Sequence, residues 1–157
     1  MPEPSPVTGL PRPVARALAG TPEIGAEEAA FLVLTIHEDG APHVTLLSRA
    51  ELASVEDELM LTLAGRSTPD NMDRTGTAAL FAVVDDTAYT CQLRVLDRLV
   101  EAGLVGYRLA VTGHRADSLG IPLSPIGYVT PPELPSVERW TTSARLLDRL
   151  VERRHPS

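Results

Sequence analysis

The residues best suited to chemistry stand where a predicted strand runs directly into a predicted helix. Residues 59–64 read LMLTLA and residues 65–69 read GRSTP, with the proline at a position typical of the first turn of a helix. A helix N-terminus exposes backbone N–H groups and the positive end of the helix dipole, and both attract an anion. Ser67 and Thr68 add hydroxyl donors, and Arg66 adds a positive charge. Together these groups are sufficient to bind one phosphate.

Ser67 and Thr68 also fit a plainer role. A Ser or Thr at this point commonly caps a helix by accepting a hydrogen bond from an N–H group of the first turn. Asp70 would then complement the helix dipole, and its charge would oppose a bound anion. The spacing leaves the cap and the phosphate site open as alternatives.

Other reactive side chains give weaker signals. His37 and His43 lie on opposite sides of a predicted hairpin, but two histidines without a third ligand make a poor metal site, so solvated hairpin ends are the simpler interpretation. Residues 65–69 match a G-x-S-x-G nucleophile motif only in part, because proline replaces the second glycine and no Asp and His follow in a suitable fold. Cys91 lies inside a predicted strand, which favours a small buried apolar residue over a nucleophile.

Composition limits the classes of partner. The chain has 157 residues, which normally form one domain, and a formal net charge of −7. All 14 residues in the combined count of lysine and arginine are arginines, so mechanisms that require a lysine are excluded. The negative charge and the 4% of aromatic residues argue against a nucleic acid partner. The longest apolar run, residues 29–34, falls far short of the roughly 20 residues that span a membrane. A single cysteine and the lack of a secretory signal indicate a cytoplasmic protein.

The elements that must position these residues are mostly short strands. Apolar, β-branched runs predict six strands, at residues 31–37, 43–48, 59–64, 77–84, 88–95 and 104–112, and Asp39-Gly40 supplies the first hairpin turn. Helices are predicted at residues 14–19, 25–30 and 67–75, with one or two helical turns at 96–102. Strands joined mainly by short turns favour a mainly β (α+β) fold in which an antiparallel sheet closes into a small barrel.

Two segments flank this barrel. Residues 1–24 are predicted to be a proline-rich arm with a short helix, outside the core, so the domain runs over residues 25–157. After a proline-rich loop, residues 136–154 give the clearest helix, with Ser136 as its cap. Its apolar face contains Val137, Trp140, Ala144, Leu147, Leu150 and Val151. An aromatic residue among aliphatic ones favours a core position for Trp140, and covering a groove is the alternative.

Four segments, taken in order, resemble one known family. They are the hairpin turn at 39–42, the strand HVTLLS at 43–48, the segment from Leu61 to Asn71, and the strand YTCQLRV at 89–95. Their order and spacing resemble the flavin-binding split-barrel family, also called the pyridoxamine 5′-phosphate oxidase-like family. The resemblance implies that the predicted barrel is a six-stranded antiparallel split β-barrel with a few short helices and a C-terminal helix.

The resemblance also implies a cofactor site. The isoalloxazine ring of FMN would be lined, mostly through backbone groups, by Val44, Thr45, Leu46, Leu47, Ser48, Leu61 and Thr62. Ser67 and Thr68 stand where the oxidase has a basic pair on the FMN phosphate, so Arg66 would supply the charge. Some smaller split-barrel proteins have such a Ser/Thr pair before a helix with an asparagine, here Asn71, and Gln92 matches a glutamine that contacts the flavin. The family is homodimeric, with flavin in the groove between subunits, and the same assembly is implied here.

The resemblance supports a cofactor more than a reaction. The chain has no counterpart of the C-terminal Trp and Arg segment with which the oxidase holds its vitamin substrate, so oxidation of pyridoxamine phosphate is not implied. The leading hypothesis is an FMN-binding oxidoreductase or flavin reductase of a small-molecule redox substrate, with no catalytic side chain because the flavin carries the redox chemistry. One alternative is a deazaflavin, whose more negative tail would require more arginines near Arg66. The other is a non-catalytic binding or regulatory protein.

Overall fold

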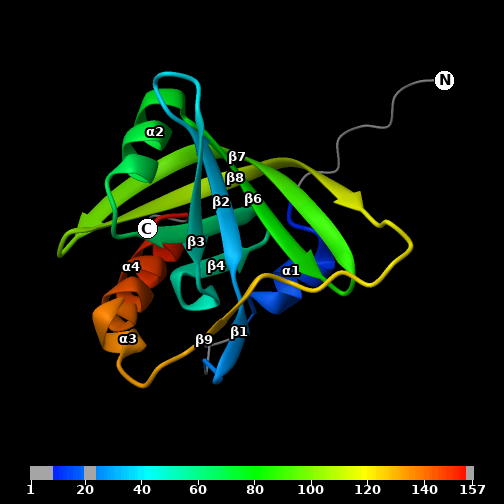
Figure 1. Cartoon of the computed structure of the whole chain (residues 1–157). Coiled ribbons are helices and arrows are strands. Elements are labelled where there is room, and N and C mark those ends of the chain that lie inside the picture. The colour runs from blue at the N-terminus through cyan, green and yellow to red at the C-terminus, as the bar shows by residue number, and fades with distance from the viewer. Residues whose placement is uncertain (1–8, 20–23, 155–157) are drawn as a thin grey trace.

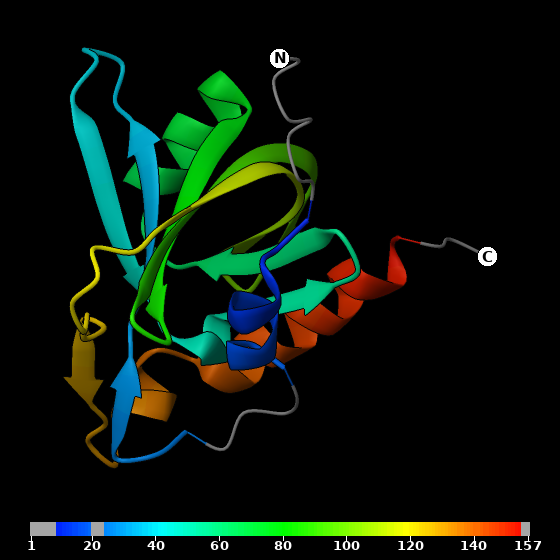
Figure 2. The same ribbon diagram turned by 90° about the vertical axis from the view of Figure 1, so that its right-hand side faces the viewer.

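The computed structural model describes residues 9–19 and 24–154, and its centre is one antiparallel sheet of seven strands in the order β3-β2-β6-β7-β8-β5-β4. The strands of this sheet are β2 (Phe31–Ile36), β3 (Pro42–Leu47), β4 (Leu52–Val55), β5 (Glu58–Leu63), β6 (Thr77–Val84), β7 (Thr87–Glu101) and β8 (Leu104–Asp117). A separate pair joins β1 (Glu27–Ala29) to β9 (Gly127–Val129). The helical elements are α1 (Arg12–Ala17), the 3₁₀ turn η1 (Arg49–Glu51), α2 (Ser67–Thr75), α3 (Leu134–Val137) and α4 (Trp140–Glu152). Figures 1 and 2 show α2 near one end of the curved sheet and α4 near the opposite end.

The sheet confirms the antiparallel β architecture and corrects the predicted count of six strands. The additional strand of the main sheet is β4, whose four residues are too few to show a clear alternation in the sequence. It follows β3 through η1, so the two edge strands of the sheet are consecutive in the chain. Within the described residues these edges do not pair with each other, so the sheet stays open between them.

The first hairpin and the helix beside it form as predicted. In the β2–β3 register, Leu34 pairs with Val44. The turn contains Gly40 at a φ of +88°, and the Asp39 carboxylate accepts the N–H of Ala41 at 3.0 Å. Alternate residues of β2 are buried, as expected of a strand with one face on the core. Helix α2 has the predicted bounds of 67 and 75.

The prediction of helical turns at residues 96–102 is wrong. Strand β7 continues to Glu101, and Ala102 and Gly103, with φ of 49° and 82°, make the turn into β8. The pairing of β7 with β8 shifts register between Gln92 and Leu93 and again between residues 95 and 97. A register shift interrupts the period-two alternation of a strand, which is why the apolar residues here matched a helical spacing.

The helix predicted at residues 25–30 is also wrong. Residues 27–29 form β1, which pairs with β9 inside the segment predicted to be a loop. Glu27 pairs with Val129 and Ala29 with Gly127. A strand of three residues depends on hydrogen bonds from its distant partner, so no local pattern indicates it.

The main hydrophobic core includes the N-terminal helix. Val14 and Leu18 are 0% and 5% exposed and pack with buried residues of β2, β5, β6, β7 and β8. The expectation that the N-terminal arm lies outside the core is therefore wrong for α1. Residues 1–8 and 20–23 of that arm lie outside the described residues.

The predicted C-terminal helix is divided in two. Arg139 adopts a φ of +54° and separates α3 from α4, so Ser136 lies inside α3 instead of capping a long helix. Val137 is exposed, and the buried face of α4 consists of Trp140, Ser143, Leu146, Leu147 and Leu150. This face packs with Met60 and Leu104 of the sheet in a second core. Among the described residues, no helix is both long and apolar enough to cross a membrane.

The close approach of α4 to the sheet gives a stability prediction. A Cβ atom on Gly106 would lie 2.8 Å from Leu146 Cγ and 2.8 Å from Leu150 Cδ1. Gly106→Ala is therefore expected to lower the free energy of unfolding by about 1–3 kcal/mol through overpacking. Gly65→Ala is the control, because a Cβ atom there has nothing within 4 Å. Urea denaturation of both variants measures the difference, and equal midpoints would contradict this view of the α4 interface.

Candidate functional site

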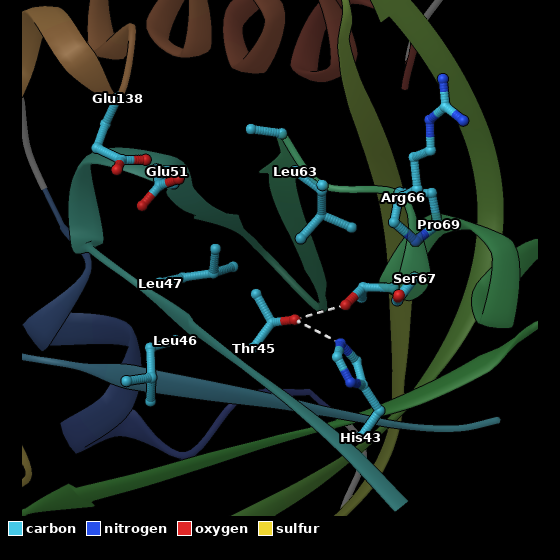
Figure 3. A pocket seen from close by; sticks show the side chains of 13 residues that line it. His43, Thr45, Leu46, Leu47, Glu51, Leu63, Arg66, Ser67, Pro69 and Glu138 are labelled. Carbon is cyan, nitrogen blue, oxygen red and sulfur yellow. Dashed lines mark hydrogen bonds between the residues drawn. The ribbon is translucent and has the colours of Figure 1, made fainter.

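A cavity of about 330 Å³ lies between β3 and the N-terminus of α2. Its wall consists of His43, Thr45, Leu46, Leu47, Glu51, Leu63, Ala64, Gly65, Arg66, Ser67, Thr68, Pro69 and Glu138. Strand β3 and the strand-to-helix segment at residues 63–69 form opposite sides of it, as Figure 3 shows. The structure thus brings together the two segments in which the sequence placed most of its candidate residues. We call this space the first cavity.

The N-terminus of α2 is open toward the first cavity. No side chain caps it, and in the described chain the N–H groups of Ser67 and Thr68 have no hydrogen-bond acceptor. The capping hypothesis is therefore wrong. The reason is that Arg66 already has helical angles (φ −100°, ψ −37°), so the helix begins before the proline and the two hydroxyl residues lie within its first turn.

The hydroxyl of Thr68 points across the cavity to β3 instead. Thr68 Oγ1 and Thr45 Oγ1 lie 2.5 Å apart, and the Thr45 hydroxyl is also 3.4 Å from His43 Nε2. Thr68 is 4% exposed, so this pair is a buried link between α2 and the first hairpin. The side chains of β3 and α2 therefore present polar atoms beside the open N–H groups.

Asn71 holds α2 against the other strand of the hairpin. Its amide nitrogen donates to Thr35 Oγ1 at 3.0 Å and lies 3.3 Å from His37 Nδ1, while Arg74 donates to its amide oxygen at 3.2 Å. Since the arginine fixes which amide atom is oxygen, His37 Nδ1 must act as an acceptor. Asn71 is 2% exposed, so it supports the site from behind instead of opening into the first cavity.

Neither the histidine pair nor the cysteine forms a reactive centre in the described structure. His37 and His43 face each other across the hairpin with ring centroids 4.7 Å apart. Within residues 9–19 and 24–154, no group of three potential metal ligands comes together. Cys91 is buried, and burial raises the pKa of its thiol to about 11, which leaves it protonated at neutral pH. The preference for a buried apolar role at Cys91 is confirmed.

The other predicted site residues divide into three groups. Thr45, Leu46 and Leu47 line the first cavity, and Ser48 lines a neighbouring one. Arg66 is at the rim, and Figure 3 shows its guanidinium directed away from Ser67 and Thr45. Outside both of these cavities lie the exposed Val44 and Gln92 and the fully buried Leu61 and Thr62. The Thr62 hydroxyl donates to Ser143 in α4 at 2.9 Å.

A second cavity of about 370 Å³ adjoins the first. Its wall consists of Ala30, Leu46, Leu47, Ser48, Glu51, Ile126, Gly127, Tyr128, Val129, Pro131, Leu134, Glu138 and Trp140. The two cavities share Leu46, Leu47, Glu51 and Glu138, so they form one groove along β3. Trp140 is both 8% exposed and part of this wall, so its core position is confirmed and it also faces the groove.

Glu51 is the most perturbed carboxyl group of the groove. Its pKa is raised to about 7, mainly by burial and to a smaller extent by the charge of Glu138, while a hydrogen bond from the Ser48 N–H at 3.0 Å opposes the rise. The same bond is part of a capping box at η1, in which Ser48 Oγ accepts the N–H of Ala50 at 3.1 Å. Tyr128 donates its hydroxyl to Ser48 Oγ at 2.6 Å, which ties β9 to this corner.

Sequence reasoning missed the polar residues Glu51, Tyr128 and Glu138 of the second cavity. The S-x-x-E spacing of Ser48 and Glu51 is a capping-box signature and was a usable signal for η1. Tyr128 stands in a proline-rich segment that was predicted to be a loop, and its position depends on the pairing of β1 with β9, which no local pattern predicts. Glu138 stands in the helix predicted at residues 136–154 and reaches the cavity at the break between α3 and α4.

Comparison with known proteins supports the fold. No protein-family model and no curated protein matches the chain. Among solved structures, flavoredoxin from Methanosarcina acetivorans gives a TM-score of 0.54 at 10% identity, over 72% of this chain and 88% of that protein. The styrene monooxygenase flavin reductase of Pseudomonas putida S12 gives 0.52 at 9% identity, over 67% and 92%. A protein with a split barrel domain from Shewanella frigidimarina NCIMB 400 gives 0.51 at 10% identity, over 66% and 73%. At these identities the likeness concerns the fold, and the chain therefore has a split-barrel fold similar to that of these proteins.

Proposed function

We propose that the chain binds FMN in the groove along β3 and works as an oxidoreductase or flavin reductase of a small-molecule substrate. The observation that carries the proposal is the uncapped N-terminus of α2, which opens into the first cavity beside the hydroxyls of Ser67, Thr68 and Thr45. Similarity in fold to flavin reductases adds support. When bound, FMN would supply the redox chemistry, and the chain would bind it, orient it and keep water from its ring.

The phosphate end of the groove fits a dianion. The N–H groups of Ser67 and Thr68 have no acceptor in the described chain, and the dipole of a nine-residue helix adds partial positive charge at the same point. Arg66 is exposed and forms no ion pair with a described residue, so its flexible side chain can turn toward a phosphate. Asp70 is exposed in the same turn and reduces this attraction.

The ring of the cofactor would lie along β3. This strand is an edge of the sheet, so in the described chain one side of its backbone pairs with β2 and the other side has no partner strand. The outward-facing peptide groups of residues 44–47 are therefore available to polar atoms of a flat ring. Leu61 and Thr62 are buried in β5, so in this proposal they support the wall of the groove.

The proposal includes a homodimer. Ile36, Val44 and Leu46 on the first hairpin are 47%, 47% and 58% exposed, and together they form an apolar surface beside the groove. A second copy packed here would cover this surface and close the groove. Gln92 lies outside both cavities, so it would contact a flavin held by the partner subunit.

A deazaflavin is the alternative cofactor in the same fold. Its longer anionic tail favours additional arginines, whereas Arg66 is the single arginine on the described wall of the first cavity. This observation favours FMN. An absorption spectrum of the purified protein separates the cases, because flavins and deazaflavins differ in their visible bands and a colourless protein that ignores both would support the non-catalytic alternative.

The phosphate assignment gives a prediction at Ser67. Ser67→Asp is expected to weaken FMN roughly tenfold or more while leaving riboflavin affinity unchanged, because the new carboxylate repels only the phosphate. An aspartate in the first turn of a helix is compatible with the fold. Titration of the flavin-free chain with both ligands, followed by flavin fluorescence, measures the two affinities. Equal losses for FMN and riboflavin would remove the phosphate from this helix end.

A second prediction concerns Arg66. Arg66→Glu is expected to cost roughly tenfold or more in FMN affinity, about 1.4 kcal/mol, with riboflavin again unaffected. Arg145→Glu is the matched control, since Arg145 is exposed on α4 and, among the described residues, its guanidinium donates one 3.4 Å hydrogen bond, to the Thr142 hydroxyl. The same titrations apply. Unchanged FMN affinity in Arg66→Glu would show that the guanidinium keeps the outward direction seen in Figure 3.

A further inference from the structure

The second cavity has a wall chemistry of its own. It lies between β3 and the segment that carries β9 and α3, and most of its wall is apolar, including Leu46, Ile126 and Val129. Two aromatic side chains, Tyr128 and Trp140, face the same space. An apolar cavity with a few polar groups at one side is the usual form of a small-molecule site.

Two carboxyl groups stand where this cavity meets the first one. Glu51 and Glu138 line both cavities, and Figure 3 shows their carboxyl groups beside each other at the end of the first cavity away from Ser67. The charge of Glu138 disfavours ionisation of Glu51 and contributes to the raised pKa of Glu51. In the described part of the chain, neither acid forms an ion pair, so the boundary carries negative charge that no neighbour compensates.

The charged groups around Glu51 are otherwise engaged. Arg49, on the same 3₁₀ turn, pairs with Glu28 of β1 at 3.0 Å. Arg139, which follows Glu138, donates to the carbonyl oxygen of Ala102 at 2.5 Å. Tyr128 of β9 is neutral at ordinary pH, because burial raises the pKa of its hydroxyl. A cation that enters the cavity therefore meets two unpaired acids and no competing positive charge.

We propose that the second cavity binds an organic cation with a flat, apolar body. Its charged group would lie at Glu51 and Glu138, and its flat face would lie against Tyr128 and Trp140. Carboxylates attract the charge, and aromatic rings add cation–π attraction. The aliphatic wall covers the body of the molecule. The identification of this ligand as the redox substrate rests on the proposed function. The preference of the cavity for a positive charge does not depend on that function.

Trp140 makes the proposal measurable without a flavin. It is the one tryptophan of the chain and lies on the cavity wall, so its fluorescence reports on a ligand there. Benzamidine, benzamide and benzoate are probes of nearly one shape that carry a positive charge, no charge and a negative charge. At about pH 8, benzamidine is expected to give a saturable change and to bind roughly tenfold more tightly than benzamide, with benzoate weaker still. No saturable change with benzamidine, or equal affinities for benzamidine and benzoate, would overturn the proposal.

The pH dependence and two variants test the carboxyl groups. Because the pKa of Glu51 is about 7, its ionised form grows as pH rises from 6 to 8, and benzamidine affinity is expected to rise with it while benzamide affinity stays constant. Glu51→Gln keeps an acceptor for the capping box, and it is expected to weaken benzamidine roughly fivefold and to flatten this pH dependence. Glu138→Gln should weaken benzamidine as well.

The matched control is Asp148→Asn, which removes one negative charge from the exposed side of α4, away from the cavity wall. Its affinity for benzamidine is expected to equal that of the unchanged chain. Unchanged affinity in both Glu51→Gln and Glu138→Gln would contradict the proposal. Failure of FMN to bind, with the benzamidine preference intact, would remove the proposed function and leave the cation site. Binding of FMN without a preference for benzamidine would remove the cation site and leave the proposed function.

Discussion

The groove depends on hydrogen bonds that hold the first turns of α2 against the β2–β3 hairpin. Thr68 bonds to Thr45 on one strand, and Asn71 bonds to Thr35 on the other. Thr35, Thr68 and Asn71 are all buried, where a polar group without a partner costs about 1–3 kcal/mol, so folding strongly favours the geometry that satisfies them. That geometry directs the free N–H groups of α2 into the first cavity. The same bonds explain why the hydroxyl of Thr68 serves packing between elements instead of capping its own helix.

The parts of the fold that were predictable have local causes. The first hairpin is specified by a β-branched run on each side of Asp39-Gly40, and α2 is specified by GRSTP at its start and a glycine at its end. The segments of the first cavity were therefore predictable, because strand, turn and helix follow one another in the chain. The direction of each side chain was not predictable, since it depends on whether the helix begins at residue 67 or two residues later. The starting residue decides whether Ser67 and Thr68 cap the helix or leave its N–H groups open to an anion.

The parts that could not be predicted depend on contacts between distant segments. The register shifts of β7 occur in its pairing with β8, a contact between separate segments, and they hide the strand pattern at residues 96–102. The break at Arg139 separates α3, with no buried residue, from α4, whose buried face packs closely over Gly106. β1 and β9 form only as a pair. The last two features border the second cavity, so that half of the groove has no signature in any short stretch of sequence.

The two ends of the first cavity differ in charge, and this difference gives a molecule bound there a direction. The open helix end offers N–H donors and a positive dipole, whereas Glu51 and Glu138 offer carboxyl groups at the other end, where the second cavity begins. A ligand with an anionic tail is stabilised only with its tail at α2, because the reverse orientation places that charge beside two acids. If both proposals hold, the acids would keep the two ligands apart, since the helix end attracts a phosphate and repels a cation while the acids attract a cation and repel a phosphate. Burial adds a further condition, because Glu51, with a pKa of about 7, is only about half ionised near pH 7, so this discrimination strengthens as the solution becomes more basic.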